Sequence, residues 1–409
     1  MPAEHAESEP RAAFTDAEPR LPDASAEPRP ETGPRRADIE DNGAGLASDP
    51  EPVSDPAASL RADNRLLELL DKDMDRAVAE SAEHRRLQFS KHVVGNPMVR
   101  HFVDYYSGSA RRYFRELLER SGKYLPMISK VLNQEGLPEE LGYLALIESE
   151  FNVDVKSPSG AVGLWQFVAG TARSYGLRID EWVDERRDPV KSTRAAAAYL
   201  KDLHDRYGRW YLATAAYNAG PGRINRAMKS SGANDFWSLS QKASLSEETR
   251  NFVPKFVAIV LIASDPQGYG LDEIEYAPPL DYEEVELPWP MPLALLANWA
   301  DSDMATLREL NPAILRHTTP PGERGFRINL PVGHADVYLA RAHEKFGGNN
   351  AQPVRILTHE VRKGDTLYAI AKRYGQQVRA LMEFNGLSHA RLRIGQKISI
   401  LLNEMSALR

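Results

Sequence analysis

Glu148 is the residue on which a chemical interpretation of this chain depends. It ends an apolar helical run that includes Leu141, Leu144 and Ile147. A carboxyl group held against such a face loses water, which disfavours its charged form and raises its pKa. A carboxyl that keeps its proton near neutral pH can act as a general acid. Taken alone, however, a helical glutamate of this kind is more often a structural residue in an ion pair.

A second carboxylate is the group that glycoside hydrolysis normally requires, one acting as acid and the other as base or nucleophile. Glu150 follows Glu148 by two positions and would point to another face if the helix continued. Asp154 could lie close only if the following loop folds back. We therefore expect Glu148 to work as a single carboxylate.

Three polar clusters follow Glu148. Residues 157–167 combine glycines, which let the backbone approach a bulky ligand, with Gln166, which offers both a donor and an acceptor. Residues 216–223 place Tyr217 and Asn218 at a helix C-terminus before Gly220. Residues 248–255 open a last helix with Glu248. Each cluster also has a structural interpretation: core packing for Trp165 and Tyr217, and a first-turn acid for Glu248.

The elements that must position these residues are helices. Apolar and aromatic residues recur at three- and four-residue spacing between 96 and 133, which predicts successive amphipathic helices. Gly136-Leu137-Pro138 indicates a helix stop and restart before Glu148. Further helices are expected at about 171–175, 189–207, 211–217, 223–230 and 247–263. No β-alternation interrupts this span, so the sequence predicts an all-α domain.

An internal repeat follows a lead-in over 271–292 that reads as a linker or extended segment. Two short helices ending in Asn occur twice, at Asn311 and at Asn385, with an offset of 74 residues. Alternating stretches at 359–361 and 397–401 flank the second copy and predict a β-α-α-β unit. The first copy lacks the Gly364-Asp365 turn and has prolines instead, so it is expected to be degenerate.

Composition excludes several classes of protein. The 409-residue chain has no cysteine, so it can form neither a disulfide nor a cysteine metal site. Its net charge of −7 comes from the first 60 residues, which carry −9 and leave +2 for the rest. We find no metal or nucleotide site and expect no cofactor. The longest apolar run, 257–263, is far shorter than the ~20 residues needed to span a bilayer.

Four short motifs occur in order along the chain: Glu148-Ser149, Gly163-Leu164-Trp165-Gln166, Ala216-Tyr217-Asn218-Ala219-Gly220 and Glu248-Thr249-Arg250-Asn251. In this order, they resemble the motifs of the soluble-type lytic transglycosylase catalytic domain, which has a goose-type lysozyme-like fold. Residues 363–396 resemble a LysM peptidoglycan-binding module.

Residues 1–62 are acidic, rich in Pro and poor in aliphatic residues, so their composition predicts a disordered tether, with an irrelevant N-terminus as the alternative. For the rest, the resemblance implies a mainly α catalytic domain followed by small α+β (βααβ) LysM modules. The expected parts are a lytic transglycosylase catalytic domain over 63–270, a linker and degenerate LysM-like repeat over 271–350, and a LysM domain over 351–409. The implied reaction cleaves the β-1,4 bond between N-acetylmuramic acid and N-acetylglucosamine without water and leaves 1,6-anhydromuramoyl ends. Glu148 would act first as acid and then as base.

Substrate contacts are implied for the remaining motif residues. One departure is Phe252, where the family usually has a tyrosine near the acid. The implied cleft residues are Ser149, Ser157, Gly163, Gln166, Tyr217, Asn218 and Glu248; the implied glycan-binding loops of the LysM contain Gly364, Asp365, Thr366, Asn385 and Gly386.

The expected partner is the peptidoglycan glycan strand. Residues 351–409 carry +6, which suits an anionic wall polymer, and we do not expect nucleic acid because aromatic and basic residues are not interleaved there. We expect a monomer in the periplasm or cell envelope. Outer-membrane anchoring through a segment outside this chain is left open. The alternatives are a catalytically inactive peptidoglycan-binding protein and a hydrolytic muramidase.

Overall fold

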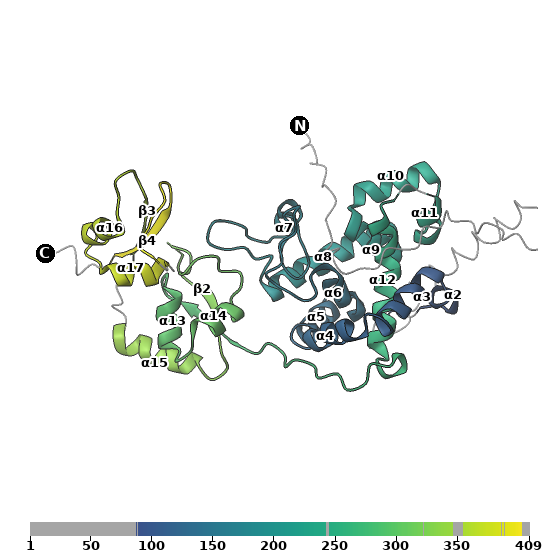
Figure 1. Ribbon diagram of the computed structural model, residues 1–409, viewed down its shortest axis with the longest axis horizontal. Helices are drawn as coiled ribbons and strands as arrows, with labels where there is room; N and C mark the ends of the chain where they lie inside the picture. The colour runs from purple at the N-terminus through teal and green to yellow at the C-terminus, as the bar shows by residue number, and fades with distance from the viewer. Residues whose placement is uncertain are drawn as a thin grey trace, which may run out of the picture.

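A computed structural model describes residues 87, 89–242, 245–321, 323–346, 355–385, 387 and 389–402. The tether expected over 1–62 and the helical run expected from Asn64 towards Glu80 lie outside the described residues. In Figure 1, helices gather on one side of the molecule and the small modules with strands on the other.

The helical domain contains the elements that the periodicity of the sequence predicts. Helix α8 has the predicted bounds, and α9, α10 and α12 begin and end within one or two residues of theirs. Among the described residues of this domain, strand-like pairing is confined to isolated bridges. The elements are α2 (Lys91–Val94), α3 (Pro97–Ser107), α4 (Arg111–Ser121), α5 (Leu125–Gln134), η1 (Glu139–Gly142), α6 (Tyr143–Ser149), α7 (Ala169–Ser174), α8 (Pro189–Tyr207), α9 (Trp210–Ala219), α10 (Pro221–Ser231), α11 (Phe236–Lys242), α12 (Glu247–Ser264) and η2 (Gln267–Tyr269).

Local signals set the ends of the longest helices. Asp188 caps α8 by accepting from the Val190 and Lys191 N–H groups, and Pro189 occupies its first turn. Gly208 ends α8 with a φ of 64°, the left-handed conformation that favours glycine. Ser246 caps α12 by accepting from the Thr249 N–H. These caps satisfy backbone groups that a helix end would otherwise leave without partners.

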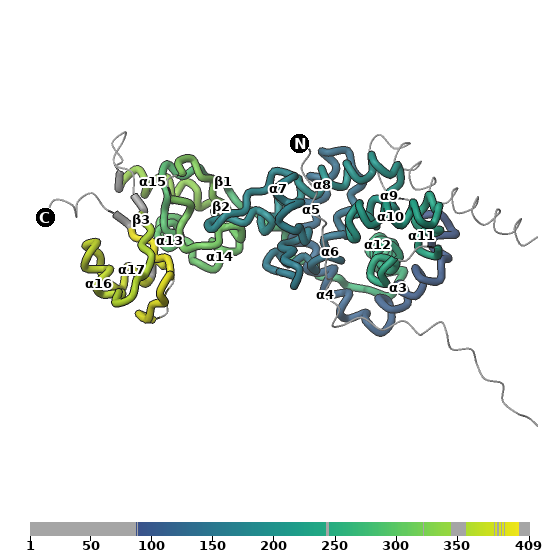
Figure 2. The backbone as a smooth tube through the Cα atoms, turned by 90° about the horizontal axis from the view of Figure 1, so that it is seen from above, coloured from purple at the N-terminus to yellow at the C-terminus, as the bar shows by residue number. Residues whose placement is uncertain are grey.

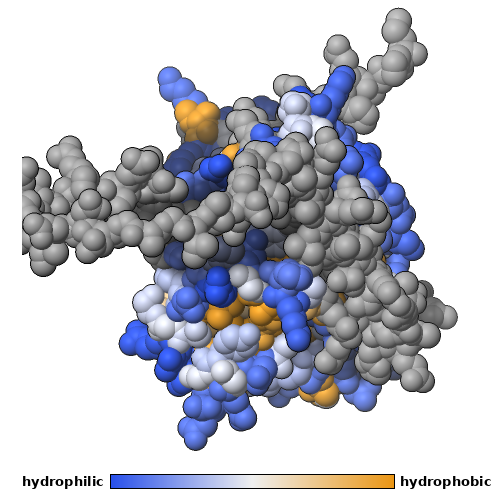
Figure 3. Space-filling view, turned by 90° about the vertical axis from the view of Figure 1, so that its right-hand side faces the viewer, coloured by the Kyte–Doolittle hydropathy of each residue, from blue (hydrophilic) through white to orange (hydrophobic). Residues whose placement is uncertain are grey.

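The core of the helical domain is built around α12. This helix packs against α3, α9 and α6, and its residues from Phe252 to Val260 are buried. Seen from the side of this domain, the surface is mostly hydrophilic, with a small apolar area in the middle of the view (Figure 3). The apolar residues therefore lie mainly inside, where α6 carries Glu148 against α12.

An extended segment connects the helical domain to the modules. The Ala277 N–H donates to the Glu119 carbonyl (2.8 Å) and the Leu280 N–H to the Lys123 carbonyl (3.1 Å), so the segment runs along the ends of α4 and its following loop. Within the stretch 271–292, predicted as a linker or an extended lead-in, Glu283–Leu287 form strand β1. Three glutamates obscured this strand, although Val285 and Leu287 alternate inward as a half-buried strand requires.

Two β-α-α-β modules follow, each with its own apolar core. Strands β1 and β2 pair antiparallel, as do β3 and β4. Figure 2 shows the two modules one after the other beyond the helical domain. The elements are β1 (Glu283–Leu287), α13 (Leu293–Trp299), α14 (Met304–Leu310), β2 (Phe326–Leu330) and α15 (Ala335–Phe346), then β3 (Arg355–Glu360), α16 (Leu367–Arg373), α17 (Val378–Asn385) and β4 (Lys397–Leu402).

The structure confirms the internal repeat. Both helices of the second module begin 74 residues after their counterparts, at Leu367 and Val378 against Leu293 and Met304. The terminal asparagines make the same contacts: Asn311 Nδ2 donates to the Leu307 and Asn329 carbonyls, and its Oδ1 accepts from the Asn329 N–H. Each asparagine thus joins the second helix to the closing strand.

Asn385 repeats this pattern in the second module. Its Nδ2 donates to the Leu381 and Ser399 carbonyls at 2.8 Å, and its Oδ1 accepts from the Ser399 N–H at 2.7 Å. A side-chain amide is suited to this position because it offers both donors and an acceptor to an incoming strand. The repeated asparagine therefore has a structural reason to recur.

Candidate active site

Glu148 lies in the last turn of α6 and is 6% exposed. Leu144 and Ala145, which precede it on the helix, are fully buried. A pocket of about 280 Å³ opens beside it, lined by the end of α6 and by residues of α3, α4 and α12. The predicted acid is thus a buried carboxyl with one side towards a pocket.

Aromatic and basic side chains form much of the wall of this pocket. Tyr105 and Tyr106 come from α3, Tyr113 from α4 and Lys255 from α12. Lys255 is 9% exposed and its Nζ lies 5.7 Å from the Phe102 ring centroid. The sequence pattern indicates only helix faces for the tyrosines and includes Lys255 only in the cluster 248–255. A lysine inside the apolar run of α12 is the signal that points to it.

Ser149 ties the end of α6 to the loop after it. Its Oγ lies 2.9 Å from the Leu164 carbonyl oxygen and 3.0 Å from that of Ala145. The side chain is 3% exposed and lines the same pocket as Glu148. Ser149 is therefore placed to hold Glu148 in position against residues 155–167.

Glu150 also lines this pocket, and the expectation that it points to another face is wrong. The helix ends at Ser149, and Glu150 takes the left-handed conformation with a φ of 54°, so helical spacing no longer applies. Its Oε1 accepts from the Tyr113 hydroxyl at 2.6 Å, and Arg120 lies 3.6 Å from its Oε2. A second carboxylate is thus present beside Glu148.

The loop over 155–167 is fixed by backbone contacts and by a buried ion pair. Gly163 has a φ of 83°, and a Cβ there would lie 1.9 Å from the Arg186 carbonyl oxygen, so only glycine fits. Arg186 pairs with Asp184 at 2.7 Å and donates to the Gly160 and Phe167 carbonyls. The loop is therefore held at Gly163 by its close approach to the Arg186 backbone, and at Gly160 and Phe167 by the Arg186 guanidinium.

Gln166 and Ser157 use their polar atoms within this loop. Gln166 Nε2 donates to the Gly163 carbonyl (2.9 Å) and the Val155 carbonyl (3.2 Å), and the side chain is 3% exposed. Ser157 Oγ accepts from the Ala161 N–H at 3.0 Å. Their contacts with substrate stay predictions.

Tyr217 and Trp165 lie in the core behind the loop. The Tyr217 hydroxyl donates to the Trp165 carbonyl at 2.7 Å, and both side chains are almost fully buried. Trp165 Nε1 donates to Thr193 Oγ1 at 3.0 Å. Neither residue lines the pocket beside Glu148, so the structure gives Tyr217 an internal partner and leaves its contact with sugar a prediction.

Asn218 and Glu248, from separate motifs, are brought together. Asn218 Nδ2 donates to Glu248 Oε1 at 2.9 Å, and Asn218 Oδ1 accepts from the Thr249 hydroxyl at 3.0 Å. The pair joins the end of α9 to the start of α12, outside the lining of the pocket beside Glu148. Phe252 is buried in the core, consistent with the absence of a polar role.

The predicted LysM residues surround the first turn of α16 and the end of α17. Thr366 caps α16 through the Ala369 N–H, and Gly364 has a φ of 92°. The Arg362 N–H and the His359 imidazole hold the pKa of the Asp365 carboxyl below its usual value. Gly386 lies outside the described residues. These contacts shape the module; glycan contact stays a prediction.

Comparison with known proteins finds three domain families that match parts of this chain. Residues 126–240 match the transglycosylase SLT domain, residues 281–343 the LysM-like domain of lytic transglycosylase MltD, and residues 359–401 the LysM domain. The membrane-bound lytic murein transglycosylase D of Escherichia coli K12 is 30% identical over 303 residues, 71% of this chain and 66% of that protein. The chain thus spans just under two thirds of this relative's length.

Two further proteins are similar over shorter spans. The peptidoglycan transglycosylase gp16 of Escherichia phage T7 is 34% identical over 134 residues, 32% of this chain and 10% of that protein. A solved structure of an inactive mutant of lytic transglycosylase Slt from Pseudomonas aeruginosa covers 37% of this chain and 25% of its own, with 26% identity and a TM-score of 0.30. The chain therefore carries a transglycosylase SLT domain followed by LysM domains.

Proposed function

We propose that this protein is a lytic transglycosylase that cleaves the β-1,4 bond between N-acetylmuramic acid and N-acetylglucosamine in peptidoglycan. The observation that carries the proposal is Glu148, which is 6% exposed in the SLT domain and lines a pocket. Burial of this degree favours the protonated carboxyl, which is the form that can protonate a leaving oxygen.

The reaction needs only this carboxyl and the substrate. Glu148 gives its proton to the glycosidic oxygen, and the bond between that oxygen and C1 of the muramoyl residue breaks. The resulting carboxylate takes the proton from the C6 hydroxyl, whose oxygen forms a new bond to C1. The product has a 1,6-anhydro end, no water is consumed, and Glu148 is again protonated.

The neighbouring side chains support this role in different ways. Ser149 is placed to fix the position of Glu148 through its contact with the Leu164 carbonyl. Tyr113 and Lys255 line the pocket and supply a hydroxyl and a positive charge near the reacting sugar. We propose that Ser157, Gln166, Tyr217, Asn218 and Glu248 shape the cleft mainly through the contacts described above.

Glu150 favours one alternative, a hydrolytic muramidase. Two carboxylates that line one pocket are what a glycoside hydrolase uses. Glu150 already accepts from the Tyr113 hydroxyl and lies 3.6 Å from Arg120, so its carboxylate has partners within the protein. We assign it a structural role and make hydrolysis an outcome of the test.

Mass spectrometry of sacculi digested in heavy-oxygen water separates the reactions. The transglycosylase yields muramoyl ends that lack one water and contain no heavy oxygen. A hydrolase yields reducing ends that have incorporated it. An inactive wall-binding protein yields no soluble products while still sedimenting with sacculi.

The matched pair Glu148→Gln and Glu150→Gln assigns the acid. Loss of a general acid typically lowers turnover by about 10²–10⁴-fold, so we expect Glu148→Gln to abolish measurable product while binding to sacculi persists. Glu150→Gln should still form anhydro ends. Equal loss in both variants, or full activity in Glu148→Gln, contradicts the assignment.

The LysM domains support peptidoglycan as the partner. We propose that Gly364, Asp365, Thr366, Asn385 and Gly386 belong to glycan-binding loops and that the protein acts as a monomer. The cell envelope is the compartment in which this substrate occurs, and a curated relative is named as membrane-bound. Within the described part of this chain, every helix is too short or too polar to cross a bilayer.

A further inference from the structure

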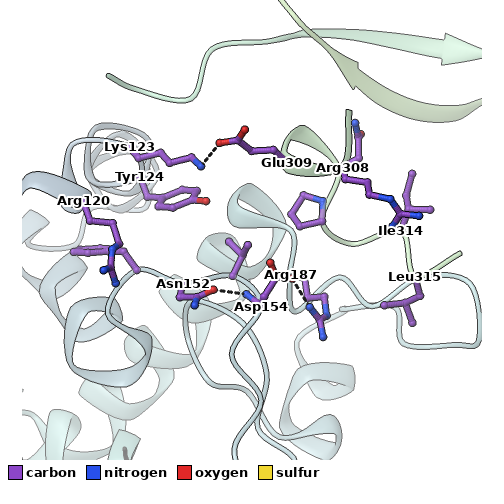
Figure 4. Close-up of a pocket in the computed structure, with 14 residues that line it drawn as sticks. Arg120, Lys123, Tyr124, Asn152, Asp154, Arg187, Arg308, Glu309, Ile314 and Leu315 are labelled. Carbon is purple, nitrogen blue, oxygen red and sulfur yellow. Dashed lines mark hydrogen bonds and ion pairs between the residues drawn. The ribbon is translucent and has the colours of Figure 1, made fainter. Parts of the chain in front are cut away.

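A second and larger cavity, of about 700 Å³, lies between the helical domain and the first βααβ module, residues 281–343. Arg120 and Asn152 line both this cavity and the pocket beside Glu148, so the two are neighbours. Figure 4 shows Arg120, Lys123 and Asp154 on one side and Arg308 and Ile314 on the other. No sequence motif pointed to this cavity, because its walls come from distant parts of the chain.

The contacts between the two domains fix the walls. The Asp184 N–H donates to the Ala313 carbonyl and the Leu315 N–H to the Trp182 carbonyl, both at 2.9 Å. Lys123 pairs with Glu309 across the cavity mouth at 2.5 Å (Figure 4). The module therefore takes part in a structured boundary beside the active site.

Arg308 brings a positive charge that no carboxylate neutralises. Its Nη2 donates to His317 Nδ1 at 2.7 Å, and among the described residues it has no ion-pair partner. Burial, followed by the charges of Arg308 and Arg316, lowers the pKa of His317, so the imidazole is neutral at pH 7. The guanidinium therefore keeps its full charge.

Arg187 is a second basic residue in the lining of the cavity, and one of its N–H groups has no partner within the described structure. Its Nη1 pairs with the exposed Asp154 at 2.5 Å, while its buried Nε has no partner within the described structure. A buried N–H without a partner is costly, and a ligand atom that accepts from it removes that cost. Asn152 and Asn311 add amides to the lining, and Val153, Ile314 and Leu315 add apolar contacts.

We propose that this cavity binds a carboxylate-bearing peptide substituent of the glycan substrate, with Arg308 as its main anionic contact. The proposal rests on the proposed function, because such peptides are attached to muramoyl residues. Sugar hydroxyl and amide oxygens accept single hydrogen bonds from a guanidinium, whereas a carboxylate can accept two parallel, charge-assisted hydrogen bonds from it. The volume lies within the ~300–1,000 Å³ range of ligand pockets, and mixed apolar and amide walls suit a peptide.

The test compares two substrates and two variants. The substrates are peptide-bearing glycan strands and the same strands after an amidase has removed the peptides. Arg308→Gln removes the one positive charge that has no ion-pair partner among the described residues of the cavity lining. Arg327→Gln is the matched control, because Arg327 is an exposed arginine of the same module that pairs with Glu284 outside the cavity.

We expect the ratio of kcat/KM on peptide-bearing strands to kcat/KM on peptide-free strands to fall roughly tenfold in Arg308→Gln, equivalent to about 1.4 kcal/mol. The ratio in Arg327→Gln should equal that of the wild type. Amidating the peptide carboxylates of the substrate should lower the wild-type ratio to that of Arg308→Gln. A misfolded variant would lose activity on both substrates alike and leave the ratio unchanged.

Two outcomes overturn the proposal: an unchanged ratio in an Arg308→Gln variant whose kcat/KM on peptide-free strands equals that of the wild type, or a wild-type ratio that does not respond to amidation of the carboxylates. Failure of the proposed function looks different, because the wild type would then form no anhydro ends from either substrate. The two inferences are thus tested separately.

Discussion

Replacing Gly163 by alanine tests whether the loop behind Glu148 is as tightly constrained as the contacts indicate. A Cβ at this position would lie 1.9 Å from the Arg186 carbonyl oxygen and 2.7 Å from its carbon, both backbone atoms. The segment around Arg186 cannot yield freely, because its guanidinium is held by Asp184 and by two carbonyl oxygens of the loop. Gly163→Ala must therefore displace the loop or the segment against it.

Gly160 in the same loop provides a control with the same backbone conformation. Its φ is 82° against 83° for Gly163, but a Cβ there would meet nothing within 4 Å. Alanine at a left-handed φ costs roughly 1–2 kcal/mol. Loss of backbone freedom in the unfolded chain offsets about 0.4–1 kcal/mol of this in both variants. Overpacking adds about 1–3 kcal/mol for Gly163→Ala alone.

Thermal unfolding of the helical domain, followed by far-ultraviolet circular dichroism, measures the difference. A difference of about 2 kcal/mol in the free energy of unfolding corresponds to a Tm lower by roughly 4–8 °C in Gly163→Ala than in Gly160→Ala for a domain of this size. We also expect lower activity in Gly163→Ala, because the Leu164 carbonyl that contacts Ser149 would move. Equal Tm values for the two variants would refute the steric argument.

Two further predictions concern the modules. The pKa of His317 is lowered from 6.5. Neutral His317 therefore contributes fully to the free energy of unfolding above pH 6.5, and this contribution is lost as the pH falls below that value. In His317→Asn, which keeps an acceptor for Arg308, the free energy of unfolding measured with urea should change less with pH in this range. Asn311→Ala removes three hydrogen bonds and leaves part-buried backbone groups of Asn329 without these partners, so it should cost about 2–4 kcal/mol in the same assay. Asn385→Ala should cost a comparable amount. A loss of less than ~1 kcal/mol in the asparagine variants would contradict the prediction for these contacts. A pH dependence of the free energy of unfolding in His317→Asn equal to that of the wild type would contradict the prediction for His317.

Elements with local signals were predicted well. Asp188 before Pro189 and glycine at position 208 mark both ends of α8, and the helix begins and ends where these residues require. The repeat was visible because Asn311 and Asn385 must each offer donors and an acceptor to a closing strand, which few other side chains can do. Such constraints act within a few residues and leave a trace in the sequence.

Features that depend on where a helix ends were not predicted well. Glu150 was placed on another face because α6 was assumed to continue, whereas it ends at Ser149. The strand Glu283–Leu287 was missed because its outward residues are glutamates and its partner Phe326–Leu330 is about 40 residues away. Pairing with a distant strand has no signal inside the segment itself.

The residue types alone determined that this chain has a helical domain built to bury one glutamate and a pair of related modules after it, because periodicity and capping are local properties. Only the tertiary structure decided what surrounds that glutamate. Tyr113, Glu150 and Lys255 line the pocket of Glu148 from three different segments, and Arg308 and Arg120 line one cavity from two domains. Such neighbours are set by how helices and modules pack, which is a property of the whole chain.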